Sequence, residues 1–180
     1  MAGLKFRILL DSEVKSEVFR DILIDEADNF EVFYRKILEA YNFRSEQMAS
    51  FYISNDDWDK GHEVTLMDMS FGEEPLEASI MSLTKLKELV EANDQKIILV
   101  HDFLRMWIFL IELIDLEVNA PENPIILLSV GEAPLEDSRT AEDNEDMFVG
   151  EDEDEDEFGF DDFDDDFSEE DYSGFDDYEY

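Results

Sequence analysis

The chain has 180 residues, of which 51 are acidic and 13 are basic, so its formal net charge is −38, and it has no cysteine. This length is near that of one domain. Without cysteine the chain can form no disulfide, no thiolate metal site and no cysteine nucleophile. The negative charge repels nucleic acid and anionic lipid, so we expect a basic protein partner and no direct binding to nucleic acid or membrane.

The charge divides the chain in two. All Lys and Arg lie at or before Arg139, whereas residues 141–180 contain 22 acidic residues and no basic one. Folding would bring these carboxylates together for little apolar burial. We therefore predict a globular domain over 1–140 and a disordered acidic–aromatic tail over 141–180.

Two apolar stretches bear on location. The N-terminal "MAGLKFRILLDSEV" has too short an apolar core for a secretory signal. The window "IILVHDFLRMWIFLIELIDL" contains too many charged residues for a membrane span. We expect a cytoplasmic protein.

Apolar periodicity predicts alternating strands and helices in the domain. In chain order we predict strands over 4–10 and 17–25, a helix over 30–43 capped by Asn29, strands over 48–54 and 62–67, a short helix over 85–93 opened by Ser82 or Thr84, and strands over 96–103 and 106–118. Residues 121–137 are predicted to be a loop, a short apolar segment and an exit punctuated by Gly and Pro.

This order, ββαββαββ, predicts the α+β class, with a mostly antiparallel sheet and two helices packed on one face. The side chains expected to face the core alternate on the first strand and recur every three or four residues on the helices. They are Leu4, Phe6, Ile8 and Leu10, then Phe30, Phe33, Tyr34, Ile37, Leu38 and Tyr41, and then Leu83, Leu86, Leu89 and Val90.

Several stretches resemble one family. "VFRDILIDEADNFEVFYRKILEAYNF" followed by "QMASFYI" is similar to the family named after the third open reading frame of an Ri plasmid, also described as TnpR-like passengers of an insertion element. Its pattern is Trp-Arg on a strand, Leu-x-x-Leu-His-x-x-Ile on a helix, and then His-Leu-x-x-Phe. The corresponding residues here are Phe19, Arg20, Phe30, Phe33, Tyr34, Ile37, Gln47, Met48 and Phe51.

Two later motifs extend the resemblance over about residues 4–137 and none of the tail. "LVHDFLRMW" resembles Tyr-x-Tyr-Asp-Phe-Gly-Asp-x-Trp, and "GEAPLED" resembles Gly-x-x-x-Pro-Pro-Glu-Asp. The retained residues are Asp102, Phe103, Trp107, Gly131, Pro134, Glu136 and Asp137. The resemblance implies a mainly prokaryotic family and a fold, but no activity.

The departures from the pattern lie at its polar positions. Tyr34 and Gln47 replace both histidines, His101 replaces a tyrosine, and Leu104 and Arg105 replace the glycine and the acid of the turn. A reaction that used those two histidines would be absent from this chain.

Few residues could carry chemistry. Asp102, Glu136 and Asp137 are candidate acid–base residues, but acid–base work needs a partner group and a pocket, and the sequence shows neither. The expected role of Asp102 is to accept backbone N–H bonds in the turn at 103–105. His62, in the acidic segment "NDDWDKGHE", would suggest a metal site, but the spacing fails the EF-hand pattern. We predict an acidic turn there, and no metal or cofactor.

The acidic tail contains aromatic side chains that it cannot bury by itself. We predict that its carboxylates attract a basic surface and that its rings dock on it, so that the tail could mimic a nucleic-acid backbone for a nucleic-acid-binding protein. The ring residues assigned to partner binding are Phe158, Phe160, Phe163, Phe167, Tyr172, Phe175, Tyr178 and Tyr180. The prediction is thus a non-enzymatic interaction protein.

Four alternatives stay open. The tail could be a charged segment that only keeps the protein soluble, a segment that binds cations such as calcium, or a segment that docks on its own domain. The domain could instead be a small enzyme or metal-dependent module centred on Asp102, the 134–137 segment and His62. For docking on its own domain, the basic patch would be Arg20, Arg35, Lys36 and Arg44.

Overall fold

The computed structural model describes residues 2–12, 16–44, 46–68, 72, 78–117 and 119–140. All of them belong to one compact unit, Met1–Phe148. The predicted tail, 141–180, and the eight rings assigned to partner binding lie outside the described residues.

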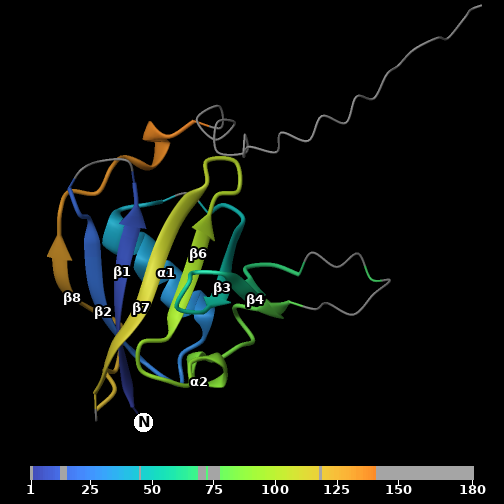
Figure 1. Ribbon diagram of the computed structural model, residues 1–180, viewed down its shortest axis with the longest axis vertical. Coiled ribbons are helices and arrows are strands. Elements are labelled where there is room, and N and C mark those ends of the chain that lie inside the picture. Colours follow the sequence, from blue (N-terminus) through green and yellow to red (C-terminus); the bar gives the residue numbers. More distant parts are fainter. Residues whose placement is uncertain are drawn as a thin grey trace, which may run out of the picture. The chain divides into compact units, whose positions relative to one another are not determined.

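Eight strands form one sheet in the spatial order β5-β4-β3-β6-β7-β1-β2-β8 (Figure 1). Every neighbouring pair is antiparallel except β4 with β5. The α+β class and the mostly antiparallel sheet are therefore confirmed. The strands are β1 (Gly3–Asp11), β2 (Phe19–Asp25), β3 (Ala49–Ser54), β4 (Lys60–Thr65), β5 (Ser79–Ile80), β6 (Lys96–His101), β7 (Trp107–Glu117) and β8 (Ile125–Val130).

The first strand lies inside the sheet, between β7 and β2. Its alternation has the predicted effect, because side chains of successive strand residues point to opposite faces. Leu4, Phe6, Ile8 and Leu10 are all buried, whereas Arg7, on the opposite face, is exposed. β1 and β2 form the predicted hairpin, with Leu4 opposite Ile24.

One helix of three turns, α1 (Phe30–Tyr41), covers one face of the sheet (Figure 1). It begins as predicted at Asn29, whose side-chain oxygen accepts the Val32 N–H at 2.9 Å. It ends at Asn42, which takes the left-handed conformation with φ 56°. All six predicted core residues of this helix are buried.

The core lies between α1 and the sheet and is rich in aromatic rings. Phe33 packs between Phe6, at 4.7 Å between ring centroids, and Phe51, at 5.7 Å and nearly parallel. All three side chains are fully buried. Such ring pairs contribute about 0.5–1.5 kcal/mol beyond the burial of their surface, so this cluster fixes how α1 sits on the sheet.

The face of the sheet opposite α1 carries ion pairs. Arg7 donates to both carboxylate oxygens of Asp21, each at 2.9 Å, across the β1–β2 pair. The Asp21 side chain is almost completely buried, and its hydrogen bond raises the pKa of Arg7. Two parallel hydrogen bonds of this kind fix geometry as well as charge.

The element order differs from the prediction at two strands, so it reads ββαβββαβββ. The two-residue β5 was not predicted, and β8 was predicted only as a short apolar segment. Gly131 follows β8 with φ 77°. A Cβ at this position would overlap the backbone carbonyl of Glu17, so only glycine fits there without strain.

The second predicted helix is much shorter than expected. α2 (Leu86–Leu89) is a single turn, and neither Ser82 nor Thr84 caps it, because its N-cap is Lys85. The prediction that Leu83 faces the core is wrong, since that side chain is 76% exposed. Backbone hydrogen bonds join α2 to the turn before α1. α2 therefore lies at one end of the sheet and not on the face that α1 covers (Figure 1).

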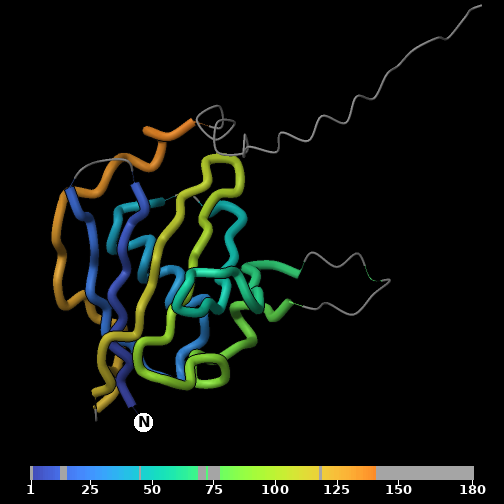
Figure 2. The backbone as a smooth tube through the Cα atoms, viewed as in Figure 1, coloured from blue at the N-terminus to red at the C-terminus, as the bar shows by residue number. Residues whose placement is uncertain are grey.

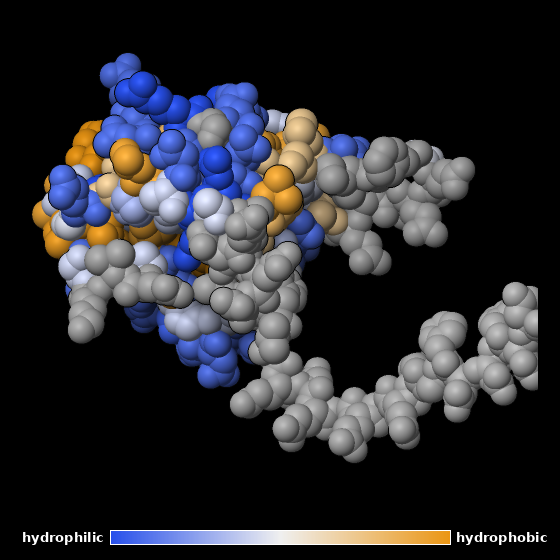
Figure 3. All heavy atoms as spheres, turned by 90° about the horizontal axis from the view of Figure 1, so that it is seen from above, coloured by the Kyte–Doolittle hydropathy of each residue, from blue (hydrophilic) through white to orange (hydrophobic). Residues whose placement is uncertain are grey.

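The two edges of the sheet are unequal. β5 has two residues, whereas β8 has six and exposes the large apolar side chains of Ile125, Leu127 and Leu128. Figure 3 shows apolar side chains gathered on the flank that β8 forms, at the left of that view. The β2–β8 register shifts between Asp21 and Ile22, and such an irregularity protects an edge from pairing with another sheet.

Among the described residues, no helix has the length and apolar character that crossing a lipid bilayer requires.

Candidate functional site

Two of the predicted site residues lie beside a buried histidine, since Glu136 is hydrogen-bonded to His101 and Asp102 follows it in the chain. His101, the last residue of β6, has no exposed surface. Its Nδ1 lies 2.8 Å from the hydroxyl of Tyr34 on α1, and its Nε2 lies 3.1 Å from Oε1 of Glu136. Glu136 begins the short 3-10 helix η1 (Glu136–Ser138). We call Tyr34, His101 and Glu136 the His101 network.

The partners fix where the imidazole proton lies. A carboxylate only accepts hydrogen bonds, so the N–H must be on Nε2 and must point to Glu136. Nδ1 then accepts the hydrogen bond from the Tyr34 hydroxyl. Burial lowers the pKa of His101, although Glu136 opposes that effect, and burial also raises the pKa of Tyr34. Near neutral pH the imidazole is therefore uncharged and the phenol protonated.

Glu136 has further contacts that hold the end of the described chain. Its Oε2 accepts the backbone N–H of Arg44 at 2.8 Å, and its carbonyl accepts the indole N–H of Trp107 at 3.1 Å. Arg139 donates to the carbonyl of Met106 and lies over the Trp107 ring, 5.0 Å from its centroid. In Figure 2 the last described residues, in orange, pass over the end of the sheet where the turn after β6 lies.

A ring wall shields the network. Phe43 lies 5.0 Å from the Trp107 ring and 5.9 Å from the His101 ring, between centroids. Phe43 and Trp107 are both buried. Because these rings keep water from the imidazole, the hydrogen bonds of the network are stronger than they would be at the surface.

Asp102 has the role expected from the sequence. Its carboxylate accepts the backbone N–H groups of Leu104 and Arg105, at 3.1 and 3.2 Å. The residue itself has φ 61°, a left-handed conformation that aspartate tolerates better than most residues. Asp102 therefore shapes the turn that brings Trp107 into position.

Two cavities flank this region and share Gln47. The smaller, about 360 Å³, is lined by Asp102, Asp137, Arg105 and Arg139, among others. Two of the three candidate acids thus converge, and the third, Glu136, is next to Asp137 but bonded to His101. The larger cavity, about 540 Å³, lies along α1 and includes Tyr34.

His62 does not belong to this site. It lies on β4, where its Nε2 is 2.7 Å from the hydroxyl of Ser79, and it lines neither cavity. Within the described ranges, no group of three His, Cys, Asp or Glu residues is placed to hold a metal ion.

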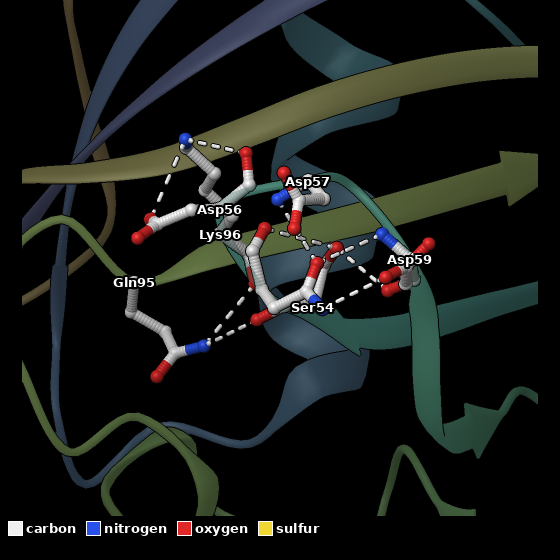
Figure 4. A network of polar contacts seen from close by, with 7 residues as sticks. Ser54, Asp56, Asp57, Asp59, Gln95 and Lys96 are labelled. Carbon is white, nitrogen blue, oxygen red and sulfur yellow. Dashed lines mark hydrogen bonds and ion pairs between the residues drawn. The ribbon is translucent and has the colours of Figure 1, made fainter.

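Residues 55–59, before β4, form a turn that is closed by side-chain hydrogen bonds (Figure 4). The side-chain oxygen of Asn55 accepts the backbone N–H groups of Asp57 and Asp59, both at 3.0 Å. Lys96 neutralises Asp56 at 3.6 Å. The polar side chains of this loop thus bond within the loop and to Lys96, as expected for an acidic turn.

The basic patch named from the sequence is only partly available. Arg20 is buried, donates to the carbonyls of Ala40, Phe19 and Val130, and stacks on Tyr41. Arg20 is therefore a structural residue, and its assignment to the patch was wrong. Arg35 and Arg44 do line the larger cavity.

The His101 network predicts a pH effect on stability. The unfolded histidine titrates near pH 6.5, whereas the folded one does so at lower pH, so the unfolded state binds more protons just below pH 6.5. Stability is thus fully present above that pH and is lost as the pH falls towards the folded value. Urea unfolding between pH 7.5 and 5.5 should show a loss of at most about 1.4 kcal/mol per pH unit.

The variant His101→Leu should lose this slope, whereas His62→Leu should keep it, because His62 is exposed. An equal slope in wild type and His101→Leu would contradict the assignment.

Sequence reasoning missed Tyr34 and His101 as site residues. The signal was present in the departures from the family pattern, where Tyr34 replaces a histidine and His101 replaces a tyrosine. These two side chains are hydrogen-bonded to each other.

Comparisons with known proteins find one matching family and a solved structure with a similar fold. The sequence model of the family described as plasmid pRiA4b ORF-3-like protein matches residues 2–176, so the prediction that the resemblance ends near 137 and includes none of the tail was wrong. No curated protein matches the chain. A crystal structure of a protein of unknown function from Methanosarcina mazei Go1 is similar, with a TM-score of 0.63 and 15% identity, over 81% of this chain and 79% of the other.

Proposed function

This chain belongs to the plasmid pRiA4b ORF-3-like family, and we propose that it is a non-enzymatic interaction protein. Its acidic, aromatic-rich segment, 141–180, binds a basic surface on a protein partner that itself binds nucleic acid. The observation that carries this proposal is the charge division, with 22 acidic residues and no basic residue after Ala141.

The contacts at the end of the described chain support the proposal. Glu136 and Arg139 are bonded to β6, to Arg44 and to the 102–106 turn, so the described residues that precede the acidic segment are fixed to the domain. Two groups that could have carried chemistry, His101 and Glu136, are used in this attachment. Both nitrogens of His101 and both oxygens of Glu136 already have partners.

The segment has two separable effects on binding. Its carboxylates attract a basic surface over a distance of about one Debye length, roughly 8 Å at physiological salt, and so increase the association rate. Its rings bury apolar surface or stack on guanidinium groups after contact, and so slow dissociation. Closely spaced carboxylates can also compete for sites that hold phosphates.

The test changes the rings and keeps the charge. The nine aromatic residues after Ala141 are replaced by serine in the full chain, with all acids retained. We expect an unchanged association rate and salt dependence with protamine, an arginine-rich protein, but dissociation about tenfold faster or more. Equal residence times for the two proteins would remove the rings from the mechanism. The residues changed are Phe148, Phe158, Phe160, Phe163, Phe167, Tyr172, Phe175, Tyr178 and Tyr180.

One observation supports the second candidate, a small enzyme centred on the smaller cavity, where Asp102 and Asp137 converge with two arginines. Asp102 is committed to its turn, so the exposed Asp137 is the carboxylate that could take a proton from a substrate. In that case Asp137→Asn would abolish turnover of any substrate found and leave protamine binding unchanged.

A further inference from the structure

The larger cavity is a groove beside α1, and the proposed function assigns no ligand to it. Its volume, about 540 Å³, is in the range of sites for small molecules. One face of α1, the loop that follows it and the two residues after β4 form its walls. The apolar lining residues include Leu38, Phe43, Met48 and Met67, and the basic ones are Arg35 and Arg44.

The floor of the groove is apolar and adaptable. Leu38 and Phe43 are almost completely buried, Met48 and Leu66 are half-buried, and Met67 is 54% exposed. Methionine side chains are flexible and make favourable contacts with aromatic rings, at about 0.3–1.5 kcal/mol each. Such a floor suits a flat aromatic group.

Four charged side chains line the groove, and three of them form ion pairs with one another. Arg35 donates to Glu31 at 2.8 Å and to Glu46 at 2.9 Å, so one guanidinium is shared by two carboxylates and is not available to a ligand. Arg44 is different, because its backbone N–H is bonded to Glu136 while its side chain makes no ion pair with any residue that the structure describes. Among the described basic residues that make no ion pair, Arg44 is the one that lines this groove.

We propose that this groove binds a small aromatic carboxylate, with the ring on the methionine floor and the carboxylate on the Arg44 guanidinium. An arginine binds a carboxylate through two parallel N–H bonds, which fixes the orientation of the ligand. All residues that line the groove belong to the described part of the domain, so this proposal does not depend on the proposed partner.

The experiment varies ligand charge and protein charge together, with the full chain. The probes are phenylpropionate and phenylpropionamide, which have nearly the same shape but differ in charge. We expect phenylpropionate to bind with a Kd of about 1 mM or tighter and to shift the NMR methyl signals of Met48 and Met67. The amide, and the variant Arg44→Gln with phenylpropionate, should each bind about tenfold more weakly.

Two controls complete the design. Lys60→Gln removes an exposed cation outside the groove and should leave the affinity for phenylpropionate unchanged. Met67→Glu places an acid in the groove wall at an exposed position and should repel phenylpropionate but not the amide. No methyl shift up to about 10 mM would overturn the proposal, and so would equal affinity in wild type and Arg44→Gln.

Discussion

A chain that ends at Thr140 should bind protamine at least about 100-fold more weakly than the full chain. The truncation removes 22 acidic residues and no base, which changes the net charge from −38 to −16. Association driven by opposite charge is faster than neutral association by about 10- to 1,000-fold, and this advantage should go with the segment. Stopped-flow or surface-based kinetics at physiological salt would measure it.

The domain itself should stay folded after this truncation. In the part of the chain that the structure describes, every buried hydrophobic residue lies at or before Leu113. The attachment by Glu136 and Arg139 is also retained. An unchanged urea midpoint is the control, and a truncated chain that binds protamine as tightly as the full chain would refute the role of the segment.

Replacing His101 by leucine should destabilise the domain by about 2–4 kcal/mol. The leucine removes the hydrogen bonds of His101 to the hydroxyl of Tyr34, which keeps only the long bond to the Gln47 carbonyl at 3.4 Å, and to one carboxylate oxygen of Glu136. An unsatisfied buried polar group costs about 1–3 kcal/mol, and more when it is charged. Urea unfolding at pH 7.5 measures the loss.

The chain supplies the matched control, since it has only two histidines. His62→Leu should change the free energy of unfolding by no more than about 0.5 kcal/mol, because that side chain is exposed and bonds only to Ser79 among the described residues. If both variants lost the same stability, the His101 network would not be the attachment described here.

The elements that could be predicted are those whose own sequence determines them. β1 alternates, and α1 has an Asn29 cap with an apolar stripe, so local pattern and tertiary burial agree there. α2 and β8 do not have this agreement. The helical pattern after Leu83 is overridden by backbone bonds to the turn before α1, and β8 becomes a strand because β2 offers it an edge.

The candidate site was predictable where its contacts are local. Asp102 bonds to residues two and three positions further on, which turn chemistry alone predicts. The contacts of His101 join residues 67 and 35 positions apart, to Tyr34 and Glu136, and no local pattern contains them. Only the sheet order, which brings the end of β6 under α1, places those groups together.

The most direct measurement is the salt dependence of protamine binding, with two full-length proteins. One is the natural chain, and the other has the 22 acidic residues after Ala141 replaced by Asn and Gln. The natural chain should lose affinity steeply as salt rises from about 0.05 to 0.2 M, because counterion screening weakens charge pairing. The neutralised chain should bind weakly at every salt concentration. Equal affinities and equal slopes for the two proteins would contradict the proposal that these carboxylates recruit the partner.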